Sequence, residues 1–120
     1  MSPKIVYIDG LATAKEAAAI MRKENVNVLI VHKRNSEDAF AIVSIYDLIK
    51  GVIIADMHSE EVNVFEIMTK PTITVPADMN IRYVARLMIR AGIRRAPVED
   101  NGELIGMITL SSLVLDNLLF

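Results

Sequence analysis

An internal repeat constrains the fold of this chain more than any other feature. The first copy of the repeated segment is AIVSIYDL at residues 41–48, and the second is GMITLSSL at residues 106–113. In both copies a short apolar run ends at a hydroxyl residue, Ser44 or Thr109, and apolar residues at helical spacing follow. The segment therefore predicts a strand that turns directly into a helix, once in each half of the chain.

The elements around the two segments also occur twice. Each half reads as a strand, a helix, two strands joined by a turn, and a second helix. Val31 aligns with Val98 at a spacing of 67 residues, whereas Ser44 aligns with Thr109 at a spacing of 65. The difference falls in the turn between the paired strands, where loops absorb changes of length. The expected fold class is therefore α+β, with two β-α-β-β-α repeats.

Hydrophobic periodicity and local signals give bounds for the elements. Strands are expected at residues 4–8, 28–31, 39–43, 72–75, 95–99 and 104–108, and helices at 14–23, 45–54, 60–68, 81–91 and 110–119. Thr13 and Glu16 form a capping-box pattern, Ser59 is expected to cap helix 60–68, and Gly92 ends helix 81–91. The chain then divides into a first repeat at 1–58, a connector helix at 59–70 and a second repeat at 71–120.

Composition excludes several classes of protein and site. The 120 residues include two histidines and no cysteine, which excludes disulfides and thiolate catalysis and leaves no nucleophile–base pair. Asp56, His58, Glu60 and Glu61 could form a metal site, but the start of a helix explains the same acids. The longest apolar runs are about five residues, whereas a membrane span needs about 20, and the N-terminus shows no signal peptide. We therefore expect a cytoplasmic protein without a metal site, and not an enzyme.

The chain resembles a tandem pair of CBS domains, which is also called a Bateman module. The resemblance rests on Met68-Thr69, IRRAPV at residues 93–98 and GMIT at 106–109 in the second half, and on Val31 and residues 41–48 in the first. It covers nearly the whole chain. It implies two repeats packed about a pseudo-twofold axis, with two clefts that bind AMP, ADP, ATP or S-adenosylmethionine in many members. No cofactor is required.

The resemblance also implies a set of ligand-binding residues for each cleft. In the first cleft, Asp47 would accept hydrogen bonds from the ribose hydroxyls, and Ser44 would lie near phosphate, where a helix start favours an anion. The other residues expected in the first cleft are Ile42, Ile73, Ile93, Arg94 and Arg95. The second cleft would use Thr109, Ser112, Met107, Val6, Val26 and Asn27. Ser112 replaces the ribose carboxylate there, so we expect the second cleft to bind weakly or to be empty.

The same residues also have an explanation that needs no ligand. Ser44 and Asp47 fit a capping box, as do Thr109 and Ser112. Losing a hydroxyl N-cap typically costs about 1 kcal/mol, which is reason enough for these residues to be present. From the residues alone, both interpretations stay open.

Two further surfaces suggest partners. The last helix is apolar around most of its circumference, which favours a homodimer through helices 45–54 and 110–119, although part of this face could be core. Its apolar residues are Leu110, Leu113, Val114, Leu115, Leu118, Leu119 and Phe120. The stripe of Arg82, Arg86 and Arg90 is expected to face solvent, with nucleic-acid binding as a weaker alternative.

These observations predict a stand-alone regulatory CBS-pair module. It would bind an adenosine-containing ligand in the cleft between the repeats and relay its presence to an unidentified partner protein. The alternatives are a ligand-free dimerisation or assembly module and, more weakly, a nucleic-acid-binding module.

Overall fold

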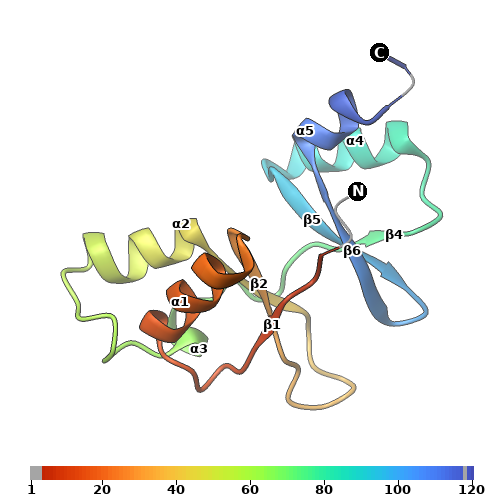
Figure 1. Cartoon of the computed structure of the whole chain (residues 1–120). Coiled ribbons are helices and arrows are strands. Elements are labelled where there is room, and N and C mark those ends of the chain that lie inside the picture. The colour runs from red at the N-terminus through yellow and green to blue at the C-terminus, as the bar shows by residue number, and fades with distance from the viewer. Residues whose placement is uncertain (1–3, 118) are drawn as a thin grey trace. The chain divides into compact units, whose positions relative to one another are not determined.

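The computed structural model describes residues 4–117 and 119–120, and these form two compact units (Figure 1). The first unit is Val6–Thr72. The second unit contains the described residues from Ile73 onward, together with Lys4 and Ile5. Each unit has its own hydrophobic core and its own three-stranded sheet.

The sheet of the first unit is mixed. Its strands are β1 (Tyr7–Ile8), β2 (Val28–Val31) and β3 (Ala41–Ser44), in that spatial order. β1 is parallel to β2, and β2 is antiparallel to β3, with Val28 opposite Ser44 and Val31 opposite Ala41. The parallel pair requires a crossover connection, and helix α1 (Ala14–Glu24) supplies it.

Local signals in the sequence account for both ends of α1. The Thr13 side chain accepts a hydrogen bond from the Glu16 N–H, and the Glu16 side chain accepts one from the Thr13 N–H, as the capping box predicted. Asn25 ends the helix in the left-handed conformation, with φ of 54°. The buried face of α1 consists of Ala14, Ala17 and Met21.

The second unit repeats this topology. Its sheet has the order β4 (Val75–Pro76), β5 (Arg95–Asp100) and β6 (Glu103–Thr109), with β4 parallel to β5 and β5 antiparallel to β6. Helix α4 (Ile81–Ala91) connects β4 to β5, and helix α5 (Leu110–Leu115) follows β6. The structure therefore confirms the α+β fold class and the two β-α-β-β-α repeats.

The bounds of α4 agree with the sequence prediction. The Asn80 side chain accepts a hydrogen bond from the Arg82 N–H at the start of the helix, and Gly92, with φ of 68°, ends it. Val84 and Met88 are buried against the sheet. Strong local signals at both ends and a regular apolar face explain why this helix was predictable.

Several other predicted bounds were too long. The N-terminal strand comprises Tyr7–Ile8 rather than residues 4–8. The strand expected at 72–75 begins only at Val75, because Thr72 instead donates its backbone N–H to the Phe40 carbonyl of the first unit. Helix α5 ends at Leu115, where Asp116 forms its C-cap, so the predicted helix 110–119 is shortened. Leu118 lies outside the described residues.

The connector contains a shorter helix than the one predicted at 60–68. Helix α3 is the single turn Val64–Ile67, and its N-cap is Asn63 rather than Ser59. The Asn63 backbone N–H donates to the Glu66 side chain at 2.9 Å, and Val64 is fully buried. The turn therefore starts where its first apolar residue can reach the core.

The helix that follows β3 changes character after one turn. Helix α2 (Ile45–Leu48) continues into the π-helical segment η1 (Ile49–Ile54), which packs closely against α3 at Gly51. A Cβ on Gly51 would lie 2.9 Å from the Ile67 Cβ and would also contact the Ile67 Cγ2. Glycine is therefore required here by the close approach of the two helices.

We predict that Gly51→Ala destabilises the protein by about 1–3 kcal/mol, although alanine is normally the better helix former. The added methyl group would force the two helices apart at Ile67. Urea unfolding checks this result. Gly10→Ala is the control, because a Cβ there meets its neighbours at 3.6 Å, an ordinary contact. Equal stability of Gly51→Ala and wild type would contradict the prediction.

Candidate functional site

The corner at the end of β3 is the best-defined candidate site. The strand stays extended up to Ser44, which has φ of −116° and ψ of 169°, and α2 begins at the next residue. The Ile45 N–H donates to the Asn27 carbonyl at 3.0 Å, which anchors the corner to the start of β2. The first unit thus holds this corner through its own sheet.

The carboxylate of Asp47 organises the corner. Its Oδ2 atom accepts hydrogen bonds from the Ser44 N–H at 2.9 Å and from the Ser44 hydroxyl at 3.2 Å. Its Oδ1 atom accepts one from the Thr69 hydroxyl at 3.0 Å. In return, the Ser44 Oγ accepts the Asp47 N–H at 3.3 Å. The predicted capping box is therefore present, and a third residue completes it.

Asp47 is also the one charged residue in the described part of the chain that is buried as a whole, with 5% of its surface exposed. A buried charge is stable only if it is hydrogen-bonded. Each carboxylate oxygen can accept about two hydrogen bonds. Oδ2 already accepts two, whereas Oδ1 accepts one, so Oδ1 has capacity for a single further donor.

Sequence reasoning missed the part that Thr69 plays. In the sequence, Met68-Thr69 is one of the motifs that resemble CBS domains, but no contact was predicted for Thr69, which lies 22 residues from Asp47. The backbone of Thr69 pairs with that of Ile42 through hydrogen bonds of 2.8 and 3.1 Å, which place its hydroxyl next to the corner. No local pattern predicts such a contact, because it depends on the return of the chain along β3.

The equivalent corner of the second unit has no carboxylate. The Thr109 Oγ1 accepts the Ser112 N–H at 3.1 Å, and the Ser112 Oγ accepts the Thr109 N–H at 3.0 Å. The Leu110 N–H donates to the Arg94 carbonyl at 3.0 Å, as Ile45 does to Asn27. The two corners therefore share a backbone arrangement and differ in charge.

The helix starts offer fewer free donors than the sequence analysis expected. At the first corner, the Ile45 and Asp47 N–H groups already have partners within the protein. At the second, the same holds for Leu110 and Ser112. An anion at either corner would therefore depend on side chains more than on the helix start.

The structure divides the predicted site residues between the two units. The first unit contains Ile42, Ser44, Asp47, Val6, Val26 and Asn27, and the second contains Ile73, Ile93, Arg94, Arg95, Met107, Thr109 and Ser112. Within the first unit, Ile42, Ser44 and Asp47 come together around Thr69. The groupings that join residues of different units stay predictions.

Other predicted clusters were also located. The stripe of Arg82, Arg86 and Arg90 is exposed on α4, and it includes Tyr83, whose ring lies 5.5 Å from the Arg86 guanidinium carbon. Sequence reasoning overlooked this aromatic residue. Among the described residues, no three His, Asp or Glu side chains converge as metal ligands, and no helix is long and apolar enough to cross a membrane.

Comparison with known proteins identifies a family for both units. The family model for the CBS domain matches residues 1–53 and again residues 64–115. An uncharacterised protein of Methanopyrus kandleri is 36% identical over 104 residues, which cover 85% of this chain and 52% of that protein. The chain therefore spans about half the length of this archaeal relative.

Two further matches extend over nearly the whole chain. The uncharacterised protein YlbB of Bacillus subtilis is 31% identical over 116 residues, which cover 96% of this chain and 77% of that protein. The crystal structure of a hexameric CBS-CP12 protein from bloom-forming cyanobacteria superposes with a TM-score of 0.92 at 33% identity. That match covers 98% of this chain and 65% of the cyanobacterial chain.

We predict that Asp47→Ala destabilises the protein by about 1–3 kcal/mol, because two donors of Ser44 and one of Thr69 lose their acceptor. Asp47→Ser should be milder, because Ser112 shows that serine can complete the same capping box. Urea unfolding of both variants checks the order. Equal losses would contradict a capping role for the side chain.

Proposed function

Because the chain belongs to the CBS-domain family and carries two CBS domains, we propose that it is a regulatory module that binds an adenosine-containing ligand. The ligand would be AMP, ADP, ATP or S-adenosylmethionine, the compounds that CBS pairs typically bind. It would contact the corner of Ser44 and Asp47. The module itself carries out no catalysis in this proposal, and an unidentified partner protein responds to it.

The ordered carboxylate of Asp47 is the observation that carries this proposal. A ribose hydroxyl needs an acceptor with a free lone pair, and Oδ1 of Asp47 has one while Oδ2 is fully used. Thr69 and Ser44 fix the orientation of the carboxylate before a ligand arrives. A preorganised acceptor loses little conformational entropy on binding.

Regulation by such a ligand requires two states of the module with different affinities. A ligand that binds one state more tightly shifts the population toward it, and a partner that recognises this state then binds more tightly as well. The free energy by which the ligand can shift this equilibrium equals the difference between its binding free energies for the two states.

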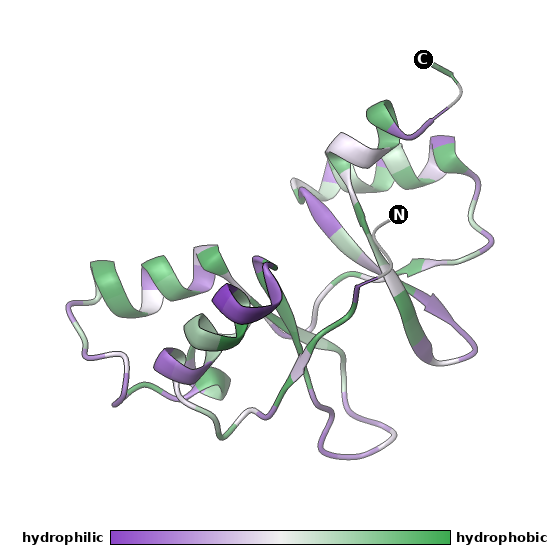
Figure 2. Cartoon of the chain, viewed as in Figure 1, coloured by the Kyte–Doolittle hydropathy of each residue, from purple (hydrophilic) through white to green (hydrophobic). Residues whose placement is uncertain are grey.

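A specific observation also supports assembly as a second function. The face of α2 and η1 exposes large apolar side chains, and Figure 2 shows the hydrophobic residues along this helix. The exposed fractions are 43% for Ile45, 64% for Tyr46, 40% for Ile49, 72% for Ile53 and 73% for Ile54. Several large apolar side chains exposed along one helix are typical of interfaces between chains. The occupant we propose is a second copy, since the cyanobacterial CBS-CP12 relative is hexameric.

We predict that one of the four adenosine compounds raises the melting temperature of the protein by several degrees. A ligand at 100 times its Kd adds about 2.7 kcal/mol of stability. Asp47→Ser should lose this shift, because it removes the carboxylate that would accept the ribose hydroxyls. The variant keeps the capping box, so the corner itself should stay folded. An unchanged melting temperature with all four compounds would contradict the proposed ligand. A shift that persists in Asp47→Ser would contradict the proposed site.

We predict that Ile53→Glu combined with Ile54→Glu weakens self-association by at least about tenfold, because two charges would have to be desolvated in the interface. Sedimentation equilibrium measures the association constant. Ile89→Glu is the matched control, since Ile89 is 68% exposed on α4, which belongs to the other unit. Unchanged association of the double variant would exclude this face as the interface.

A further inference from the structure

The first unit contains a pocket at the end of its sheet that lies opposite the Ser44 corner along β3. We call it the hairpin pocket, and its volume is about 720 Å³. It is lined by the turn after β1 (residues 9–11), the end of β2 (31–34), the start of β3 (38, 39 and 41), and Phe65, Met68 and Lys70 around α3. This size lies within the range of about 300–1,000 Å³ that is typical of small-molecule sites.

Hydrogen bonds hold one wall of the hairpin pocket in place. The Phe65 N–H donates to the Gly10 carbonyl at 2.9 Å, and the Val64 N–H donates to the Ala12 carbonyl at 2.8 Å. The Asn63 side-chain amide donates to the Leu11 carbonyl at 2.9 Å. The turn after β1 is thus fastened to α3, which makes the wall a defined surface.

A charged contact holds the opposite wall. The Asp38 carboxylate accepts from the Lys70 Nζ at 2.7 Å and from the Arg34 Nε and N–H at 3.3 and 3.1 Å. The hydrogen bonds from Lys70 and Arg34 hold the pKa of Asp38 well below its usual range, so the carboxylate stays ionised near neutral pH. The loop between β2 and β3 is therefore tied to the segment after α3.

The lining of the hairpin pocket combines apolar surface with positive charge. Leu11 is 75% exposed and Phe65 is 50% exposed, although both are large and apolar. Three cationic residues, Lys33, Arg34 and Lys70, and two carboxylates, Asp9 and Asp38, line the pocket. Counted over these five groups, one positive charge remains in excess. This combination suits a ligand with an apolar body and a single negative charge.

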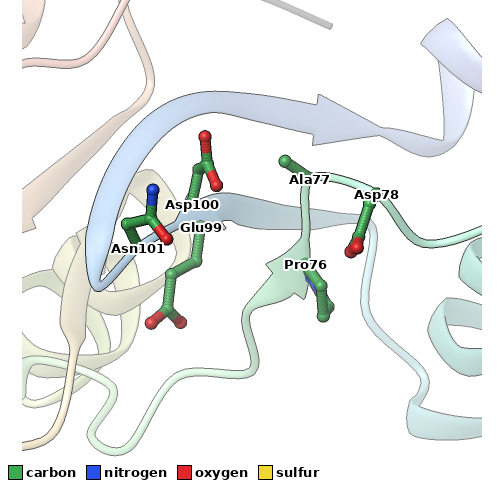
Figure 3. A pocket seen from close by; sticks show the side chains of 6 residues that line it. All are labelled: Pro76, Ala77, Asp78, Glu99, Asp100 and Asn101. Atoms are coloured by element: carbon green, nitrogen blue, oxygen red, sulfur yellow. The ribbon is translucent and has the colours of Figure 1, made fainter.

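The second unit has a pocket at the equivalent place, with the opposite charge. Its volume is about 500 Å³, and it is lined by Pro76, Ala77, Asp78, Glu99, Asp100 and Asn101 (Figure 3). Each of these six residues lies 67 positions after a residue that lines the hairpin pocket, at 9–11 or 32–34, and 67 is the repeat spacing in this part of the chain. His32, Lys33 and Arg34 thus correspond to Glu99, Asp100 and Asn101. The chain itself supplies a matched pocket that should repel an anion.

We propose that the hairpin pocket of the first unit binds a small amphipathic carboxylate, with its apolar body on Leu11 and Phe65 and its charge near Lys33 and Arg34. A monoanion balances the single excess positive charge, whereas a doubly charged phosphate would exceed it. This site is separate from the Ser44 corner, so the inference does not depend on the proposed function.

The test is an NMR titration of the ¹⁵N-labelled full chain with 4-phenylbutyrate. We expect saturable shifts of the amide signals of Gly10, Leu11, Lys33 and Phe65, and no saturable shifts at Ala77, Asp78 and Asp100. The neutral analogue 4-phenyl-1-butanol and inorganic phosphate should each bind at least about tenfold more weakly, because the alcohol lacks the negative charge and phosphate lacks the apolar body.

Variants then separate charge from shape. The double variant Lys33→Asp and Arg34→Asn gives the hairpin pocket the residues of its counterpart at these two positions, and it should weaken phenylbutyrate binding at least about tenfold. Lys15→Asp combined with Arg22→Asn makes the same charge change on the exposed face of α1 and should leave binding unchanged. Shifts of equal affinity with the neutral alcohol, shifts that survive the double variant, or no saturable shift at the hairpin pocket would each overturn the proposal.

Discussion

The hydrogen-bonded carboxylate of Asp47 is the interaction on which the first repeat most depends. A buried charge without partners would cost several kcal/mol, so the fold must deliver donors to it. Ser44 supplies two from the start of α2, and Thr69 supplies one from the segment that returns along β3. One side chain therefore fixes a strand end, a helix start and the exit of the connector. Any ligand at this corner would use a group that the fold has already positioned.

The two repeats show how one backbone arrangement can carry two chemistries. Both corners form capping boxes, yet Asp47 in the first corresponds to Ser112 in the second. Both hairpin ends form pockets, yet Lys33 corresponds to Asp100. The apolar pattern and the caps determine the backbone, and they leave charge at these positions free to differ. The differences between repeats therefore point to binding specificity more directly than the shared fold does.

The sequence predicted the ends of elements that local capping signals determine, and it failed where tertiary packing determines the structure. Helix α4 was predictable because Asn80 caps it and Gly92 ends it. The sequence predicted Ser59 as the cap of the connector helix, whereas the structure has Asn63 in that place, next to the buried Val64. The contacts between Thr69 and Asp47 and between Gly51 and Ile67 join distant or separately predicted elements, so no periodicity could reveal them. For the candidate site, sequence could name Ser44 and Asp47 but not the residue that orients the carboxylate.

The Ser44 corner and the hairpin pocket depend on consecutive residues. Thr69 donates its hydroxyl to Asp47, and Lys70 donates its ammonium to Asp38. The Thr69 backbone N–H and carbonyl are both hydrogen-bonded to Ile42, so a shift of the backbone at Lys70 would also strain these contacts of Thr69. A ligand in the pocket that moved the backbone of Lys70 would therefore also alter the support of the Asp47 carboxylate. Linkage makes this effect reciprocal. If a ligand in the pocket changed the affinity of the corner for its own ligand by some factor, a ligand at the corner would change the affinity of the pocket by that same factor. The connector segment that follows α3 is thus the element through which the two ends of this sheet would influence each other.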